Sequence, residues 1–151
     1  MKNIPIPALI LGFAGLIPFL YGAALVVLPA ATLPSIAQFN GTPDGGRALL
    51  ALYGTIILCF MAGCLWGFAS RHGRKPSWVE LGLTVTPPLI LLFMMGPSEK
   101  AACLLLTYLF ALLLLIDSYF AKRTIVVYWW LSLRIPLTIV VSICLLTGAF
   151  L

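Results

Sequence analysis

Five long apolar stretches follow one another along the chain and fill almost all of its 151 residues. Each is close to the roughly 20 residues that an α-helix needs to cross a hydrocarbon core about 30 Å thick. We therefore predict an all-α fold, an integral membrane bundle of five transmembrane helices forming a single transmembrane domain over residues 1–151. The five helices are expected at about Ile6–Leu28, Ala48–Ala69, Val79–Met95, Ala101–Phe120 and Trp129–Leu151.

The composition leaves no room for a soluble catalytic domain. Hydrophobic residues are 62% of the chain, charged residues are 9%, and the mean hydropathy is +1.13, whereas a soluble domain has about 25% charged residues. The longest connection, Pro29–Gly46, is rich in Pro, Gly, Ser and Thr and is expected to be a surface loop. The first apolar stretch exceeds the roughly 7–15 residues of a signal-peptide core, so we interpret it as the first membrane helix.

The basic residues separate by side if the chain crosses the membrane at every stretch. One side carries Lys2, Arg71, Arg74, Lys75, Lys122 and Arg123, and the other carries Arg47 and Lys100, which lie close to Asp44 and Glu99. Because positive residues concentrate on the cytoplasmic side, we expect a cytoplasmic N-terminus and an external C-terminus, in a bacterial inner membrane. The net charge of +5 is explained by this topology, and no nucleic-acid partner is expected.

No residue pattern indicates catalysis or a cofactor. The four cysteines, Cys59, Cys64, Cys103 and Cys144, lie within apolar stretches without a Cys-x-x-Cys pair, and the single histidine lies in a loop. No Ser-His-Asp or paired-carboxylate arrangement is apparent. We therefore expect no metal, no cofactor and no enzymatic activity.

Small residues and prolines indicate where helices approach each other or bend. Gly12 and Gly15 in the first helix, and the Gly-x-x-x-Gly pair Gly63 and Gly67 in the second, leave backbone bare for close packing. For Gly63 and Gly67 we favour packing within the chain over a dimer face. Pro18 removes a backbone donor from the first helix, so a kink is expected there.

The third predicted helix contains two adjacent prolines, Pro87 and Pro88, close to its centre. They leave the carbonyls near Leu83 and Thr84 without helical donors, and such groups are costly in lipid unless other groups bond to them. We expect a distortion here, with Thr84 or another polar group near the freed carbonyls. The distortion could be structural, or it could mark a ligand site of the kind found in transporters.

Asp117 and Arg134 are the only charges placed deep in the apolar stretches. They lie at similar depth on two helices joined by the short connection Ala121–Tyr128, so an intramembrane ion pair is the favoured interpretation. Arg134 could instead extend to the head groups, or the pair could handle a proton or substrate. Glu80, Thr84 and Trp66 are candidate polar neighbours. Trp129 and Trp130 are interpreted as an interfacial anchor.

The order of these features resembles the transmembrane protein 69 family, a small membrane domain of unknown function found in bacteria and mitochondria. The resemblance covers all five stretches through Pro7-Ala8-Leu9 with Gly12–Phe19, Tyr53-Gly54 with Gly63 and Trp66-Gly67, Thr84–Pro87, Asp117, and Trp129–Leu131 with Leu133-Arg134 and Leu137-Thr138. The chain departs at Trp130, where Tyr is expected, and at Thr84, where Ser is expected. The resemblance implies about five membrane helices and no established activity.

Two functions compete at this point. The favoured one is a non-enzymatic accessory or assembly protein of the lipid bilayer, with a membrane-protein partner or a homo-oligomer. The alternative is a small transporter or channel that uses the Pro87-Pro88 break and the Asp117/Arg134 pair. A polar cavity reaching either feature would favour transport, and a dry, packed bundle would favour the accessory role.

Overall fold

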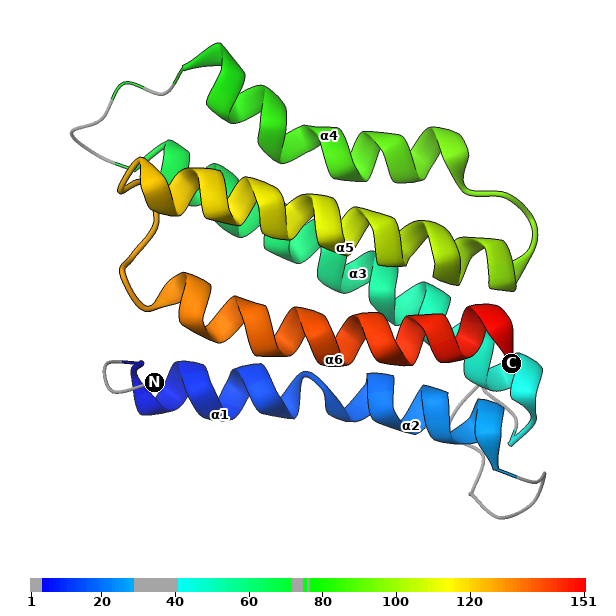
Figure 1. The fold of residues 1–151 in the computed structure, drawn as a ribbon. Helices are drawn as coiled ribbons and strands as arrows, with labels where there is room; N and C mark the ends of the chain where they lie inside the picture. The colour runs from blue at the N-terminus through cyan, green and yellow to red at the C-terminus, as the bar shows by residue number, and fades with distance from the viewer. Residues whose placement is uncertain (1–3, 29–40, 72–74, 76) are drawn as a thin grey trace.

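The computed structural model describes residues 4–28, 41–71, 75 and 77–151, and all its regular elements are α-helices. Figure 1 shows them as long rods packed side by side. The helices are α1 (Ile6–Ala14), α2 (Ile17–Val27), α3 (Pro43–Ala69), α4 (Trp78–Met94), α5 (Glu99–Lys122) and α6 (Trp130–Phe150). The predicted all-α fold class is confirmed for this part of the chain.

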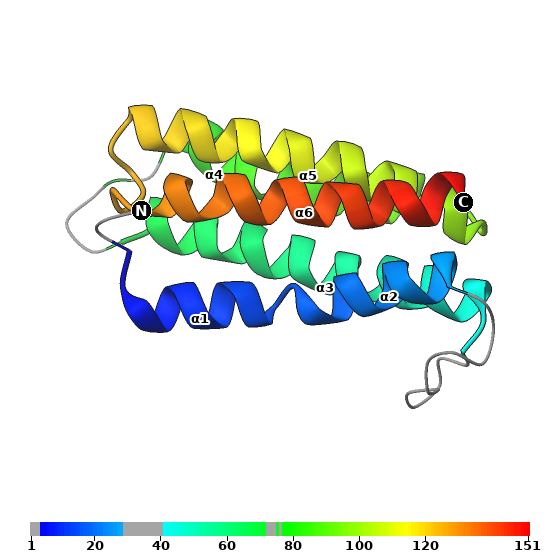
Figure 2. The ribbon, with the colours of Figure 1, turned by 60° about the horizontal axis from the view of Figure 1, so that its bottom comes forward.

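Helices α1 and α2 lie end to end, so the six helices form five antiparallel rods (Figure 1). In the two views, α4 lies on one side of the bundle and the α1–α2 rod on the other (Figure 2). Helices α3 and α5 contact each other at the centre, and α6 packs against both of them as well as against α2. The start of α1 and the end of α6 therefore lie at opposite ends of the bundle.

The described segments contain four helical spans that are long and apolar enough to cross a membrane. They are Ile6–Val27, which comprises α1 and α2, and the single helices Pro43–Ala69, Glu99–Lys122 and Trp130–Phe150. The fifth rod, α4, is apolar but has only 17 residues. At 1.5 Å per residue this corresponds to about 26 Å, slightly less than an average hydrocarbon core.

The first predicted helix is two helices. The break falls at Gly15-Leu16, just before Pro18, which lies in the first turn of α2, where a missing N–H costs little. The hydroxyl of Tyr53 on α3 donates a hydrogen bond of 3.1 Å to the Gly15 carbonyl. A donor from the neighbouring helix thus satisfies a carbonyl that the interruption leaves without a helical partner. The hydrogen bond helps to keep α1 and α2 packed beside α3 and α6.

Helix α3 begins five residues before its predicted start, at Pro43 instead of Ala48. Thr42 caps this end by accepting a hydrogen bond of 3.2 Å from the backbone of Gly45. The cap places Asp44 in the first turn, where its negative charge interacts favourably with the positive end of the helix dipole. The apolar pattern missed this turn because residues 43–47, Pro-Asp-Gly-Gly-Arg, include no large apolar side chain.

Helix α4 is continuous through Pro87 and Pro88 and is bent, not broken (Figure 1). Thr84 donates to the Leu81 carbonyl at 2.8 Å, and Thr86 donates to the Gly82 carbonyl at 2.8 Å. Both hydroxyls therefore bond to carbonyls that precede those freed by the two prolines. The predicted compensation at Leu83 and Thr84 is not among the described hydrogen bonds.

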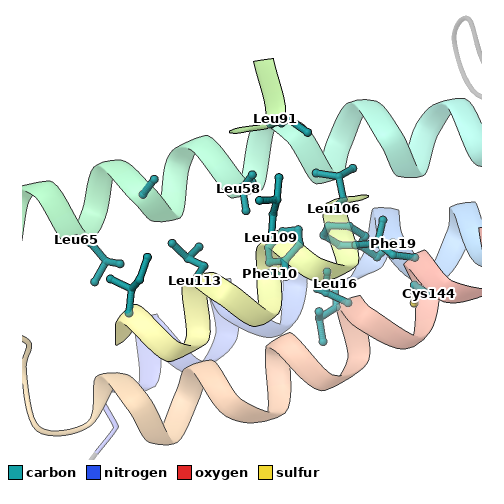
Figure 3. Close-up of a cluster of buried hydrophobic side chains, with 14 of the residues drawn as sticks. Leu16, Phe19, Leu58, Leu65, Leu91, Leu106, Leu109, Phe110, Leu113 and Cys144 are labelled. Carbon is teal, nitrogen blue, oxygen red and sulfur yellow. The ribbon is translucent and has the colours of Figure 1, made fainter. Parts of the chain in front are cut away.

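The buried core lies between α2, α3, α5 and α6. Figure 3 shows leucine and phenylalanine side chains of α2, α3 and α5 meeting there, with Cys144 of α6 beside them. The rings of Phe19 on α2 and Phe110 on α5 make an edge contact with centroids 6.3 Å apart. Where both lipid and core are apolar, van der Waals packing of this kind is a main source of helix association.

Glycines permit the closest helix contacts, though at different positions from those predicted. Gly12 does face α6, because a Cβ there would lie 3.2 Å from Leu137 Cδ1. The tightest crossing joins α2 to α3, where a Cβ on Gly46 would lie 2.7 Å from the Gly22 carbonyl oxygen. A Cβ on Gly15 would meet mainly the backbone of its own helix.

Gly63 and Gly67 pack against nothing in the described structure. A Cβ added at either position would meet no atom within 4 Å, and both residues are exposed on the outer face of α3. The favoured interpretation, packing within the chain, is therefore wrong for this pair. The error arose because a Gly-x-x-x-Gly spacing marks a bare helix face but does not specify whether that face points into the bundle or away from it.

Candidate functional site: a buried charge pair and an apolar cavity

Asp117 on α5 and Arg134 on α6 are brought together inside the bundle. Arg134 Nε donates to Asp117 Oδ2 at 2.9 Å. Both residues are buried: the side chain of Asp117 is 1% exposed and that of Arg134 is 5% exposed. The arginine therefore does not extend out to the head groups, and the carboxylate compensates its charge within the protein.

Trp130 is the third member of this arrangement. Its indole N–H donates to Asp117 Oδ1 at 2.6 Å, and its ring makes an edge contact with Phe68 on α3. The interpretation of Trp130 as an interfacial anchor is wrong, because the side chain is buried. The missed signal is its position four residues before Arg134, which places both side chains on one face of α6.

The turn after α5 fixes how these residues meet. The Ile125 N–H bonds to the Phe120 carbonyl at 2.9 Å, and the Thr124 N–H bonds to the Ala121 carbonyl at 3.0 Å. This pattern is a Schellman motif, which normally has glycine where Thr124 adopts a left-handed φ of 55°. Ile125 is fully buried and anchors the chain before it enters α6.

The other predicted polar neighbours lie elsewhere. Glu80 is buried at the start of α4, where it forms a capping box with Ser77. Thr84 bonds within its own helix, and Trp66 is 44% exposed on the outer side of α3. The described hydrogen bonds of the charge pair go to Trp130 and not to these three residues.

A cavity of about 270 Å³ lies beside Arg134, between α1, α2, α3, α5 and α6. Its lining is mostly apolar and includes Arg134, so we call it the Arg134 cavity. Arg134 Nη2 is buried and has no hydrogen-bond partner in the described part of the chain. The lining of the cavity also includes Leu11, Leu16, Phe19, Phe60, Phe110 and Trp129.

Helix α4 lies on the opposite side of α3 from α1 and α2 (Figure 1). A second hollow, of about 380 Å³, lies between α3 and α4. We call it the α3–α4 groove. It contains the small residues Cys59, Ala62 and Gly63, flanked by Trp66 on α3 and Pro88 on α4. Thr84 also lines it, although that hydroxyl is already bonded.

The described residues contain no cluster of three or more His, Cys, Asp or Glu side chains that could hold a metal ion. Cys103 and Cys144 are buried and Cys59 is exposed, and all four cysteines are free thiols.

The fold and the buried pair define a helical multi-pass membrane protein. Residues 4–150 match the family described as "Protein of unknown function (DUF3429)", and the chain belongs to that family. It is also 35% identical over 92 residues to "Transmembrane protein 69" of Xenopus tropicalis. This match covers 60% of the chain and 32% of the relative, so the chain corresponds to about a third of that protein. No solved structure matches the chain.

Proposed function

We propose that the protein is a non-enzymatic accessory protein of a membrane assembly, and that its α3–α4 groove seats a transmembrane helix of a partner protein. The observation that carries this proposal is the open face at Gly63 and Gly67, where nothing lies within 4 Å of an added Cβ. The glycines at the close helix contacts described above, Gly12, Gly22 and Gly46, are each covered by a neighbouring helix, whereas Gly63 is open and lines a groove.

A partner helix would make more van der Waals contacts with this face than lipid chains would. The backbone at Gly63 is bare, so a partner helix can approach closely and make many van der Waals contacts, including weak bonds to the backbone. Trp66 and Leu89 border the groove and are 44% and 48% exposed. They would form its rim around such a helix.

Transport is the weaker alternative. Both oxygens of Asp117 are occupied by donors from α6, and the Arg134 cavity has mostly apolar walls. A path for ions or polar solutes would need further polar groups to replace their water. The charge pair serves better as a structural link between α5 and α6.

The proposal includes five membrane crossings with a cytoplasmic N-terminus in a bacterial inner membrane. Arg71, Lys75, Lys122 and Arg123 lie at one end of the bundle, and Arg47 and Lys100 lie at the other, where Arg47 pairs with Asp44 at 2.6 Å. This distribution supports the orientation. Lys2 and Arg74 lie outside the described residues.

The experiment compares Gly63→Leu with Gly82→Leu after purification from native membranes in mild detergent. Gly82 is an equally open glycine on α4 that does not line the groove. We expect a stoichiometric partner with the wild type and with Gly82→Leu, and its loss with Gly63→Leu. A photocrosslinker attached to the exposed Cys59 should label the same partner.

Two results would contradict the proposal. One is a partner that survives Gly63→Leu and escapes crosslinking from Cys59, which would place the interface elsewhere. The other is crosslinking only to a second copy of the chain, which would make the groove a self-association surface.

A further inference from the structure

The Arg134 cavity extends along the long axis of the bundle and opens toward lipid. We propose that it holds one acyl chain of a membrane phospholipid, whose head group remains at the basic end of the bundle. Three features of the cavity support this occupant: its shape, its depth and its lateral opening. The site is independent of the α3–α4 groove and of the partner proposed for that groove.

The lining residues show that the cavity is long and narrow. On the α6 side they run from Trp129, the N-cap of the helix, to Val141, a distance of about 18 Å at 1.5 Å per residue. An apolar cavity of about 150 Å³ holds benzene, so the observed volume of about 270 Å³ has room for on the order of ten carbons. Such a volume spread over such a length fits a single extended hydrocarbon chain better than a compact ring compound.

The depth of the cavity corresponds to one leaflet of a bilayer. Helices α1 and α6 begin at the same end of the bundle (Figure 1), and Ala8 and Trp129 line the cavity near that end. Val141, at the other end of the lining, lies about halfway along α6. Half of a hydrocarbon core of roughly 30 Å is about 15 Å, which is close to the length of the cavity. Trp129 therefore lies where indoles usually meet the head groups, and a chain beside it would run parallel to the helices.

The cavity opens sideways, between α1 and α3. Helix α1 has no buried residue and packs against α6. Leu11 on α1 and Phe60 on α3 both line the cavity, and both are exposed on the outside of the bundle. A lateral opening lets one chain enter while the second chain of the same lipid stays in the bilayer. This geometry favours a phospholipid over a free fatty acid as the occupant.

The lining suits hydrocarbon and not water or ions. The charge of Arg134 is balanced by Asp117, so the wall carries no net charge at that point. A buried water needs two to four polar partners, which the mostly apolar lining does not provide. An unfilled void would forfeit van der Waals contacts along its walls, and an acyl chain from the adjacent leaflet restores them.

The experiment distinguishes a chain inside the cavity from bulk lipid around the bundle. The purified full chain is reconstituted in phosphatidylcholine vesicles that contain a phosphatidylglycerol with a diazirine near the middle of one acyl chain. After illumination, peptide mass spectrometry measures the labelling of individual residues. We expect more label on Leu137, which lines the cavity and is half-buried, than on Ile139, which is exposed on the same helix and does not line it. Bulk lipid alone would give the reverse order.

Matched variants test whether the cavity is the site. Ala8→Phe and Met61→Trp enlarge lining residues on α1 and α3. Each should lower the labelling of Leu137 at least about fivefold, because the larger side chain takes the space of the acyl chain. Ile10→Phe and Ile56→Trp change exposed residues of the same two helices that do not line the cavity, so labelling should be unchanged. The thermal midpoint of each variant shows whether it is folded.

Three results would overturn the proposal. Stronger labelling of Ile139 than of Leu137 in the wild type would show that the chain stays outside, and this comparison needs no variant. Unchanged labelling of Leu137 in a folded Ala8→Phe or Met61→Trp variant would place the chain elsewhere. Labelling of Leu137 by a diazirine fatty acid but not by the phospholipid would rule out the phospholipid as the occupant.

Discussion

Trp130 and Asp117 are joined by a hydrogen bond of 2.6 Å between the indole nitrogen and Oδ1. Arg134 occupies the other carboxylate oxygen, so α6 contributes a donor to each oxygen of one side chain on α5. Two donors from one helix face fix the rotation of α6 relative to α5. A single ion pair would leave that rotation free.

The first prediction concerns this indole. Trp130→Phe retains a ring beside Phe68 but removes the donor to Asp117. Since a hydrogen bond to a charged group contributes about 1.5–3 kcal/mol, the free energy of unfolding should fall by about that amount. Denaturation of the purified protein in mixed micelles measures the change. Trp129→Phe is the control, because no hydrogen bond is described from that indole, and it should change the free energy of unfolding less. Equal losses in the two variants would mean that the Trp130–Asp117 bond does not contribute to stability.

The second prediction concerns the ion pair. Asp117→Asn and Arg134→Gln should each lower the free energy of unfolding, because each leaves a buried partner without compensation. The double variant should lose less than the sum, with a coupling of about 0.5–3 kcal/mol. Additive losses would show that the residues are not coupled. If single variants abolished a solute flux with an unchanged thermal midpoint, the pair would serve transport instead.

The third prediction concerns Thr124. Its φ of 55° is unfavourable for a β-branched residue and favourable for glycine. Relief of that strain exceeds the extra chain entropy of glycine, so Thr124→Gly should raise the free energy of unfolding by about 0.5–1 kcal/mol. Lys122→Gly, within the last turn of α5, should lower it by up to about 1 kcal/mol. A loss of stability with Thr124→Gly would contradict the strain argument.

The fourth prediction concerns topology. Alkaline phosphatase, which is active only outside the cytoplasm, should be active when fused after Leu151. A fusion after Arg123, in the turn beyond α5, should be inactive because the basic end of the bundle is expected to face the cytoplasm. Activities in the reverse order would invert the proposed orientation.

The apolar pattern predicted where helices occur better than which faces they present. The long apolar stretches required helices, and the short connection after Asp117 brought two opposite charges to similar depth. The sequence did not reveal that Trp130 points inward or that Gly63 points outward. Lipid and protein core are both apolar, so hydrophobicity alone marks no inner face on such a helix.

Other features depended on contacts that no local pattern contains. The carbonyl exposed at Gly15 is served by Tyr53 from another helix, and the cap at Thr42 lies beyond the apolar stretch of α3. The Arg134 cavity depends on side chains from five helices. Such a cavity arises from how the helices assemble and leaves no motif in any one of them.

The Asp117–Arg134 bond also constrains how the chain enters the membrane. Helix α5 inserted alone would carry an unbalanced carboxylate, and α6 inserted alone would carry an unbalanced guanidinium, each at a cost of about 2.5–3.5 kcal/mol. The turn between them closes through Ile125 before α6 begins. The α5–α6 hairpin is thus the smallest segment that can leave the translocon electrically neutral at this depth, and the two helices should be released into lipid together.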